Sequence, residues 1–226
     1  MPSLVDLHRQ LFETQIARTA AQVRAAQRLR YLAYCEQKGY LDAALYPERC
    51  ESDDDDARSV HALLISRANR RPLGAVRLVL PPRPFPVERL LAPGRLERLR
   101  DFERARAAEI SRLCMTSELP GSLGAFAAAK DDGSDGQLRS VLRQAVAGLM
   151  RGVFALARAH DVRFVCAMTG RPVLRRLARL GVHFAELGPP IRHFGVKHPV
   201  AARVDRLLEA MRKQRPDVWE LVTHPL

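Results

Sequence analysis

The feature that most constrains the fold is a long amphipathic segment over residues 135–160, followed directly by the almost wholly apolar residues 162–168. Apolar residues recur every three or four positions in the first segment, which predicts a helix that buries one face. The second segment is short and apolar, as in a strand covered on both sides. Together they indicate an α/β fold. The helical stripe comprises Leu138, Val141, Leu142, Ala145, Val146, Leu149, Val153, Leu156 and Ala157.

Other segments also carry helical or strand-like patterns, separated by glycine and proline. We expect further helices over 8–37, about 94–106, 171–180 and from Pro199 to about Arg212, and strands over 59–66, 73–80, 108–115, 182–187 and 191–196. The first two strands are expected to form a hairpin, and the glycine-rich residues 116–136 a flexible loop. This order predicts a mixed sheet with helices on both faces, in one domain over 1–215 with a partly docked extension over 216–226.

Composition narrows the class of protein without naming a function. The formal net charge is +12, which attracts nucleic acid, anionic membranes or acidic proteins, although a genome rich in arginine codons explains it equally well. No apolar run approaches the ~20 residues of a membrane span, and the first ten residues lack a secretory leader, so we expect a cytosolic protein. Four scattered cysteines (Cys35, Cys50, Cys114, Cys166) show no ligand spacing, so no metal site is expected.

Charged residues gather at the ends of the expected elements, where α/β folds place their sites. Arg30 falls on the apolar stripe of the first helix, one turn from Tyr34, and therefore needs an anionic partner or a path to water. Each group on its own has an ordinary explanation, either a hydrated acidic loop or a surface ion pair. The remaining groups are Glu51, Asp53 and Asp56 in a loop, Arg77 in a strand, and Glu109, Ser111 and Arg112 in another strand.

In combination, the spacings of these groups resemble a known group of enzymes. Arg30…Tyr34, Glu51-x-Asp53-x-x-Asp56, Gly74-x-x-Arg77-Leu78-x-x-Pro81 and Glu109-x-Ser111-Arg112 resemble the acyl-homoserine-lactone autoinducer synthases. They are still more similar to the N-acyl amino acid synthases and the PEP-CTERM/exosortase-associated acyltransferases. The resemblance covers about residues 30–200 and implies a GNAT-like fold with a mostly antiparallel central sheet. It also implies that an acyl-carrier-protein or acyl-CoA thioester is a co-substrate, with no tightly bound cofactor.

Three departures from the family pattern affect the expected substrates. Asp54 and Asp55 fill the acidic cluster, and the aromatic residue that follows it in the family is missing. The family's late Arg-x-Pro-Tyr is replaced by Lys197-His198-Pro199-Val200, which leaves the acceptor amine open. The chain also lacks a Gln/Arg-x-x-Gly-x-Gly loop, whose N–H groups bind the pyrophosphate of CoA. Its absence favours an acidic acyl carrier protein as the donor, in keeping with the positive charge.

Acyl transfer from a thioester to an amine predicts roles for these residues. Glu109 is the candidate general base, with Arg112 beside it to tune its pKa. Strand alternation places Glu109 and Ser111 on one face and Arg112 on the other, and a β-bulge would re-aim one of them. The bulge would also splay the strand from residues 163–168, so that a pantetheine arm pairs with the edge and a freed N–H of Leu113 or Cys114 binds the oxyanion.

The acceptor site is expected to comprise Arg30, Tyr34, Glu51, Asp53, Asp56 and Arg77. Its carboxylates either hold the substrate ammonium or are tied down by the arginines, which would then also be available for a substrate carboxylate. The acyl chain is expected between the 135–160 helix and the sheet, next to Ala145 and Gly148.

Three alternatives stay open at this point. A covalent route through Cys114 would need His183 or His193 beside the thiol. A catalytically degenerate GNAT-like binding protein would keep the fold without the activity. A basic nucleic-acid-binding module would show a basic stripe with aromatic residues and no buried acidic cluster.

Overall fold

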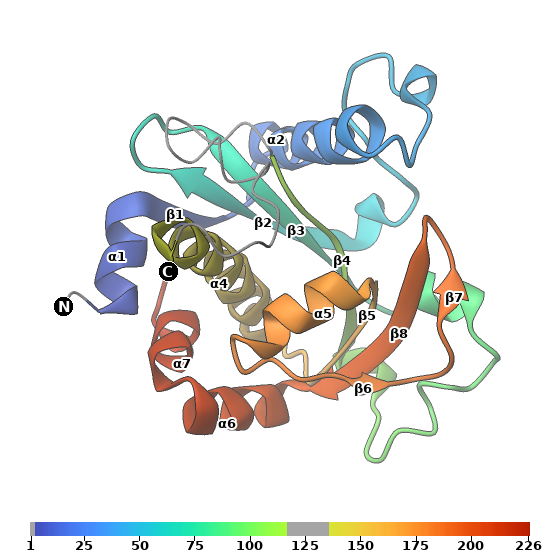
Figure 1. Cartoon of the computed structure of the whole chain (residues 1–226). Helices are drawn as coiled ribbons and strands as arrows, with labels where there is room; N and C mark the ends of the chain where they lie inside the picture. The colour runs from blue at the N-terminus through green and yellow to red at the C-terminus, as the bar shows by residue number, and fades with distance from the viewer. Residues whose placement is uncertain (1–2, 117–135) are drawn as a thin grey trace.

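The central sheet is mixed and almost entirely antiparallel. The computed structural model describes residues 3–116 and 136–226, with side chains in the second range described from residue 142 onward (Figure 1). Within these ranges, eight strands follow the order β1-β2-β3-β4-β5-β8-β6, with β7 paired to β8. Only the β4–β5 pair is parallel. The strands are β1 (Phe12–Ile16), β2 (Ser59–Ser66), β3 (Pro72–Val79), β4 (Ala107–Met115), β5 (Phe164–Thr169), β6 (Ala185–Glu186), β7 (Ile191–Arg192) and β8 (Val196–Arg203).

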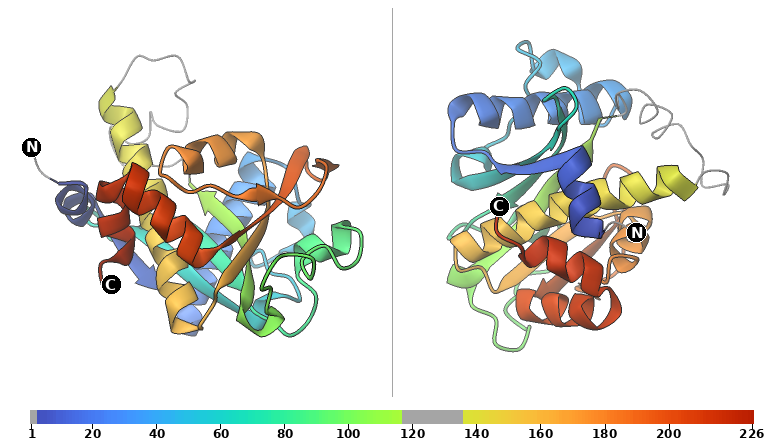
Figure 2. Two further views of the ribbon diagram at one scale, coloured as in Figure 1. Left: turned by 90° about the horizontal axis from the view of Figure 1, so that it is seen from below. Right: turned by 90° about the vertical axis from the view of Figure 1, so that its left-hand side faces the viewer.

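Helices cover both faces of this sheet (Figure 2). Helix α4 contacts β1, β2 and β3 on one face, together with α1 and α7, whereas α2 contacts β2, β3 and β4 on the other. The predicted α/β arrangement of a mixed sheet between helical layers is therefore confirmed. The α-helices are α1 (Leu4–Leu11), α2 (Ala20–Tyr31), α4 (Gly136–Ala159), α5 (Arg171–Ala178), α6 (Val204–Gln214) and α7 (Pro216–Thr223).

Strand β2 shows why both faces are buried. Ala62 and Leu64 pack in the cluster beneath α4, whereas the alternate residues Leu63 and Ile65 pack beneath α2. The middle of the strand, residues 62–65, is accordingly apolar on both faces, as a doubly covered strand requires. Helix α4 approaches β2 very closely at Gly152, since a Cβ added to this glycine would lie 2.5 Å from the Ala62 Cβ. The glycine thus sets the distance between helix and sheet.

The long first helix predicted over 8–37 is wrong. Helix α1 ends at Leu11, and β1 follows it, with Phe12 and Thr14 directed inward at every second position. Thr19 then begins α2 as its N-cap, in a reciprocal capping box with Gln22. The α-helix ends at Tyr31 and continues as a π-helical turn, Leu32–Gln37, before Gly39 takes a φ of 59°. The apolar spacing in residues 8–19 therefore comes from the end of α1 and the edge strand β1, not from one continuous helix.

The helix predicted over about 94–106 is also wrong. The segment forms turns that end in a short 3-10 helix, Arg104–Arg106, and Gly94 has a φ of 76°, which an α-helix does not accommodate. Its apolar residues are buried without a helix, because Leu96, Leu99 and Phe102 pack in a separate cluster beside β5 and Phe85. The apolar spacing therefore correctly indicated burial but not the element that achieves it.

The C-terminal third follows a different order from the predicted one. The strand expected over 182–187 is only the two-residue β6, and that over 191–196 is β7. Pro199 does not begin a helix but lies within β8, where its carbonyl oxygen accepts a hydrogen bond from the Leu187 N–H at 2.9 Å. Helix α6 begins only at Val204. Beyond it, α7 buries Val218 and Leu221 in the main core.

The remaining predicted elements match the structure closely. The hairpin of β2 and β3, the strands β4 and β5, and the helices α4 and α5 lie where their patterns placed them, within one or two residues. Most of the loop expected over 116–136 lies outside the described residues. No helix in the described part of the chain has the length and apolar character needed to cross a membrane.

Candidate active site

A β-bulge interrupts β4 where it faces β3. Ala75 pairs with Cys114 and Arg77 pairs with Ser111, so that Arg112 and Leu113 lie together opposite a single residue, Val76. Arg112 has a φ of 52°, in the left-handed region that residues with a side chain rarely adopt. The bulge proposed from the sequence is therefore present, and such bulges commonly re-aim side chains next to active sites.

The same strand separates from β5 at the bulge. Their parallel pairing runs only from Ala107 with Phe164 to Ile110 with Ala167, although β4 continues to Met115. A cavity of about 710 Å³ lies in this divergence. It is lined by the ends of both strands, the residues after the π-helical turn, segments 86–90 and 193–197, and one side of α5. In Figure 1 these segments meet between the end of α2, α5 and the β7–β8 hairpin.

Glu109 lines this cavity as a buried carboxyl without an arginine partner. Its side chain accepts a hydrogen bond from the Val87 N–H at 2.7 Å, and the residue is 3 % exposed. Burial raises its pKa to about 8, because the charged form loses hydration that the single backbone donor does not replace. The charges of Arg77 and Arg112 lower the pKa of Glu109, as expected for Arg112, but burial outweighs them. The guanidinium of Arg112 is itself hydrogen-bonded to Glu51 and Asp53.

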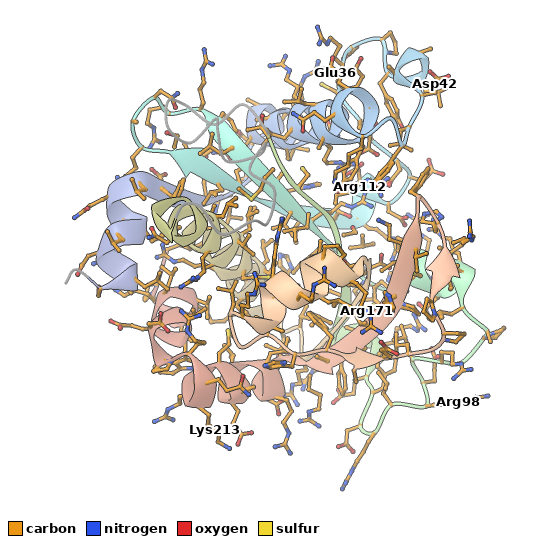
Figure 3. The ribbon with its side chains drawn as sticks, in the orientation of Figure 1. Glu36, Asp42, Arg98, Arg112, Arg171 and Lys213 are labelled. Atoms are coloured by element: carbon orange, nitrogen blue, oxygen red, sulfur yellow. The ribbon has the colours of Figure 1, made fainter. Side chains whose placement is uncertain are left out.

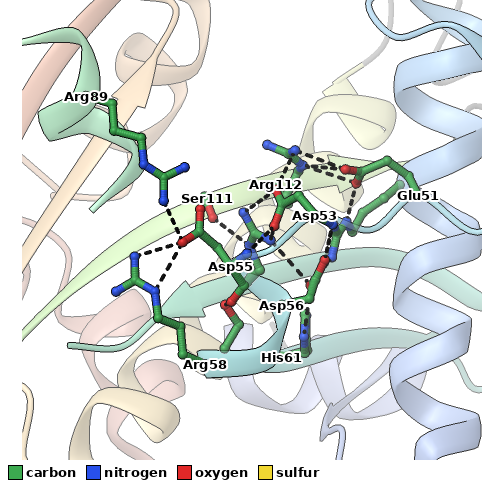
Figure 4. Close-up of polar contacts among 12 residues, drawn as sticks. Glu51, Asp53, Asp55, Asp56, Arg58, His61, Arg89, Ser111 and Arg112 are labelled. Atoms are coloured by element: carbon green, nitrogen blue, oxygen red, sulfur yellow. Dashed lines mark hydrogen bonds and ion pairs between the residues drawn. The ribbon is translucent and has the colours of Figure 1, made fainter. Parts of the chain in front are cut away.

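Three arginines and three carboxylates form a closed ion-pair cluster, drawn in Figure 4. Arg30 is fully buried and binds Glu51 at 2.5 Å and Asp56 at 2.6 and 2.9 Å. We call the six residues Arg30, Glu51, Asp53, Asp56, Arg77 and Arg112 the arginine–carboxylate cluster. It unites α2, the acidic loop, β3 and β4, as Arg30's position on an apolar stripe had required.

The bulge brings Arg112 into this cluster. Arg112 binds Glu51 at 3.0 Å and Asp53 at 2.8 Å, while Arg77 binds the same Asp53 at 2.5 Å. The Nε of Arg77 also donates to the hydroxyl oxygen of Ser111 at 2.9 Å. Ser111 thus supports Arg77 and still lines the cavity beside Glu109.

The cluster fixes the charge of its carboxylates. Burial opposes ionisation of Glu51, Asp53 and Asp56, but hydrogen bonds and charges from the arginines outweigh it and lower the pKa of each. Of the two alternatives left open by the sequence, this geometry favours arginines that tie down the acidic loop. Asp53, which is about one-third exposed, is the member of the three that also lines the cavity.

The candidate oxyanion residues separate on the two sides of the bulge. Leu113 lines the cavity, and its carbonyl oxygen accepts a hydrogen bond from the Tyr34 hydroxyl at 3.1 Å. Cys114 points away, into the cluster beneath α2, where burial raises the pKa of its thiol to about 11. His183 is hydrogen-bonded to Gln214 and is not part of the cavity wall. A covalent route through Cys114 is therefore disfavoured, because the thiol stays protonated and does not face the cavity.

The two residues expected beside the acyl chain do not line the cavity. Gly148 faces His8 and Leu64, and Ala145 is buried in the main core. Helix α4 contributes Met150 to the wall instead. The position of the acyl chain along this helix stays a prediction.

Several residues of the site could not be predicted from the sequence. Val87 supplies the one hydrogen bond to Glu109 through its backbone, 22 residues away along the chain. Asp55, which looked like one member of a hydrated acidic run, is buried and binds Arg58 at 2.8 Å and Arg89 at 2.9 Å. Lys38, Tyr40, His193, Phe194 and Lys197 line the mouth of the cavity. Among the described side chains, no group of three His, Cys, Asp or Glu is placed to hold a metal ion.

The comparisons with known proteins agree with this architecture. A model of the acetyltransferase (GNAT) domain matches residues 29–125, somewhat less than half of the chain, and includes the acidic loop and the bulged strand. The structure also resembles TofI in a ternary complex with an inhibitor and MTA, with a TM-score of 0.63 and 21% identity over 91% of this chain and 99% of that one. The chain has a GNAT-like fold.

Two further solved structures share this GNAT-like fold. FeeM, an N-acyl amino acid synthase from uncultured soil microbes, aligns with a TM-score of 0.57 and 14% identity over 90% of this chain and 96% of its own. BjaI, a CoA-dependent acyl-homoserine lactone synthase solved with SAM and isopentyl-CoA, aligns with a TM-score of 0.59 and 18% identity over 96% and 87% of the two chains. No curated protein sequence matches the chain.

Proposed function

We propose that this GNAT-like protein is an N-acyltransferase that moves a long-chain acyl group from a thioester to the amine of an amino acid or similar small molecule. One observation carries the proposal: a buried carboxyl, Glu109, faces a cavity formed where β4 and β5 diverge at a bulge. A carboxyl with a pKa of about 8 is a much stronger base than an exposed glutamate and is suited to remove a proton from an ammonium.

In the proposed reaction, Glu109 takes one proton from the acceptor, directly or through one water. The free amine attacks the thioester carbonyl carbon, and the carbonyl oxygen becomes an oxyanion stabilised by the N–H of Leu113 at the bulge. Collapse of this intermediate breaks the C–S bond and forms the amide. The departing thiolate takes up the second proton that the attacking nitrogen loses, and a thiol is released. The arginine–carboxylate cluster holds β4 and the acidic loop in place during these steps.

The apolar part of the cavity wall supports an acyl substrate. Met150, Val173, Leu177 and Phe184 line it, and all four are continuous with the main hydrophobic core. We propose that the acyl chain lies against these side chains, whereas the polar residues at the other side receive the amine. Burial of methylene groups at about 0.8 kcal/mol each would favour long chains.

The proposed donor is an acyl carrier protein, with acyl-CoA as the second choice. The net charge of +12 favours an acidic protein, and the sequence lacks the glycine-rich pyrophosphate motif. Similar structures include a CoA-dependent synthase, so both donors belong in the first assay. Nothing in the comparisons supports a link to exosortase-associated proteins. The buried acidic cluster also argues against a nucleic-acid-binding module, which was expected to lack one.

Substitution of the proposed base tests the function. We expect Glu109→Gln to lower turnover at least ~10²-fold, because an amide cannot accept the proton. Wild-type activity should rise with pH as Glu109 loses its proton near pH 8, and this limb should be absent from the variant. Acyl-carrier-protein and acyl-CoA donors are incubated with amino acids and amines, and N-acyl products are measured by mass spectrometry.

Glu209→Gln, on the exposed side of α6, is the matched control and should keep full activity. Near-normal turnover in Glu109→Gln would exclude the proposed base. Absence of product with every donor and acceptor, combined with tight acyl-carrier-protein binding, would favour the degenerate binding protein instead.

A further inference from the structure

Two lysines stand out at the mouth of the cavity. The chain has only four lysines against thirty-three arginines, yet Lys38 and Lys197 both line this one cavity. They flank the same aromatic ring, with their Nζ atoms 5.6 Å and 5.4 Å from the centroid of Tyr40. Lys38 follows the π-helical turn and Lys197 belongs to β8, so two distant parts of the chain bring them together.

Neither lysine is ion-paired within the part of the chain that the structure describes, where no carboxylate lies within ion-pair distance of either Nζ atom. The rings of Tyr34 and Tyr40 lie beside Lys38, and the ring of Tyr40 also lies beside Lys197. Among the described side chains, the two arginines of the cavity wall are ion-paired, because Arg89 binds Asp55 and Arg112 binds Glu51 and Asp53. Within this part of the chain, Lys38 and Lys197 are therefore the lysine and arginine residues of the wall that lack a carboxylate partner.

The surroundings join the two segments that carry these charges. Phe194 stacks on Tyr40 with ring centroids 5.6 Å apart, which joins the β7–β8 hairpin to the segment after the π-helical turn. Desolvation of the ammonium lowers the pKa of Lys38, and the charge of Lys197 lowers it further. A bound anion would relieve this repulsion, whereas a neutral ligand would not.

We propose that Lys38 and Lys197 bind the carboxylate of the acceptor and so select acceptors that carry an anionic group next to the reacting amine. The inference rests on the proposed N-acyltransferase function and assigns a specificity role to residues outside the arginine–carboxylate cluster. The same wall holds Glu109 for the ammonium end, so one molecule with both groups has a partner for each.

The donor's phosphate is a second source of negative charge, but its position argues against it. Lys38 lies 5.0 Å from the Tyr34 ring, whose hydroxyl binds the carbonyl of Leu113 at the bulge. The lysine is thus near the proposed reaction centre. The phosphate of a pantetheine arm lies at the far end of that arm from the thioester, whereas an acceptor carboxylate is separated from the amine by few bonds.

Matched acceptors test the carboxylate role. The kcat/KM for acylation is measured for each amino acid and for the corresponding amino acid amide, which has the same side chain and no negative charge. We expect the wild-type protein to prefer the carboxylate about tenfold or more, and Lys38→Met/Lys197→Met to lose that preference while retaining turnover of the amide. Lys38→Arg should keep most of the preference. Lys213→Met on α6 should match the wild type, because Lys213 lies far from Arg112 (Figure 3) and does not line the cavity.

A binding measurement separates this inference from the proposed function. Calorimetry compares N-dodecanoylglycine with N-dodecanoylglycinamide on the wild-type and doubly substituted proteins, without any need for turnover. Tighter wild-type binding of the acid, lost in the double variant, supports the carboxylate site even if no acceptor is acylated, in which case only the proposed function fails.

Equal binding of the two amphiphiles, or turnover without any preference for the acid, overturns the inference. So does a double variant whose KM rises for the acyl donor while its acceptor preference is unchanged, because the lysines would then hold the donor's phosphate.

Discussion

Arg30 shows how one buried charge organises the site. It is fully buried on α2 and is held by Glu51 and Asp56, and a guanidinium in that position is tolerated only with such partners. The benefit is positional rather than energetic, because desolvation offsets most of the attraction in a buried pair. The arrangement fixes the acidic loop relative to β4 and so fixes the wall of the cavity.

Removal of this charge should be costly. We expect Arg30→Met to lower the free energy of unfolding by about 3–5 kcal/mol, because it leaves Glu51 and Asp56 buried with too few donors. Urea denaturation measures the change. Arg24→Met, on the exposed side of the same helix, removes only a solvent-exposed pair with Glu48 and should leave stability unchanged.

Equal stability of the two arginine variants would show that the cluster does not depend on Arg30. A triple variant that also carries Glu51→Gln and Asp56→Asn should recover part of the loss, since neutral amides bear burial better than unpaired carboxylates.

The same residues show what a sequence alone conveys. Arg30 on an apolar stripe predicted either an anionic partner or a path to water, and the structure shows two anionic partners. Strand alternation alone does not predict the direction of the Arg112 side chain. That direction depends on the β-bulge, where Arg112 itself has a positive φ. The hydrogen-bond donor to Glu109 is the backbone N–H of Val87. Almost every residue type has this group, so the sequence does not indicate which residue supplies it.

Among the secondary-structure elements, α4 and its neighbour β2 show how closely the layers are packed. Gly152 lies over Ala62, and a Cβ added there would also lie 3.4 Å from the Thr14 Cγ2. The contact is between a helix backbone and two strands, so no flexible side-chain tip is available to move away. Glycine is therefore required here for close approach, against its poor helix propensity.

Gly152→Ala should therefore destabilise the protein by about 1–3 kcal/mol, since the overlap outweighs the roughly 1 kcal/mol gain in helix propensity. Thermal or urea unfolding provides the measurement. Gly188→Ala is the matched control, because its Cβ would meet Leu91 at an ordinary 3.7 Å. A variant at position 152 more stable than wild type would show that α4 shifts freely over the sheet.

Element prediction failed where a local signal and a tertiary contact disagreed. Proline is common at the first position of a helix, but Pro199 lies within β8, because the following residues Val200 and Ala201 pair with β5. Residues 8–19 contain enough apolar spacing for a helix, yet the edge of β2 takes Phe12–Ile16 as a strand. In both places the decisive partner is more than 30 positions away, beyond what a sequence window contains.

In the molecule as a whole, two buried histidines and one buried glutamate change the free energy of unfolding in opposite directions as the pH falls. Burial lowers the pKa of His8 and of His61 to about 4, whereas it raises that of Glu109 to about 8. The histidines bind protons more readily when unfolded, so their contribution to stability is lost as the pH falls from about 6.5 to about 4. Glu109 acts in the opposite direction, because the folded protein favours its protonated form and loses stability as the pH rises towards 8.

These effects partly cancel in the wild-type protein. We expect its free energy of unfolding to fall between pH 6.5 and 4.5, and that of Glu109→Gln to fall more steeply, by about 1.4 kcal/mol per pH unit. The variant removes the one group that gains stability from acid in this range. Urea titrations at intervals of half a pH unit give both slopes, and parallel slopes would contradict a strongly raised pKa at Glu109.

The first and last helices, α1 and α7, lie beside one another, on the other side of the molecule from the β7–β8 hairpin (Figure 1). Arg9 on α1 is hydrogen-bonded to His224 at 2.9 Å, and Arg151 binds the carbonyl of Pro225. The cavity lies on the side of the hairpin, since residues 193–197 line it. An affinity tag, fluorophore or solid-support tether attached beyond α7 should therefore leave the cavity accessible to substrates.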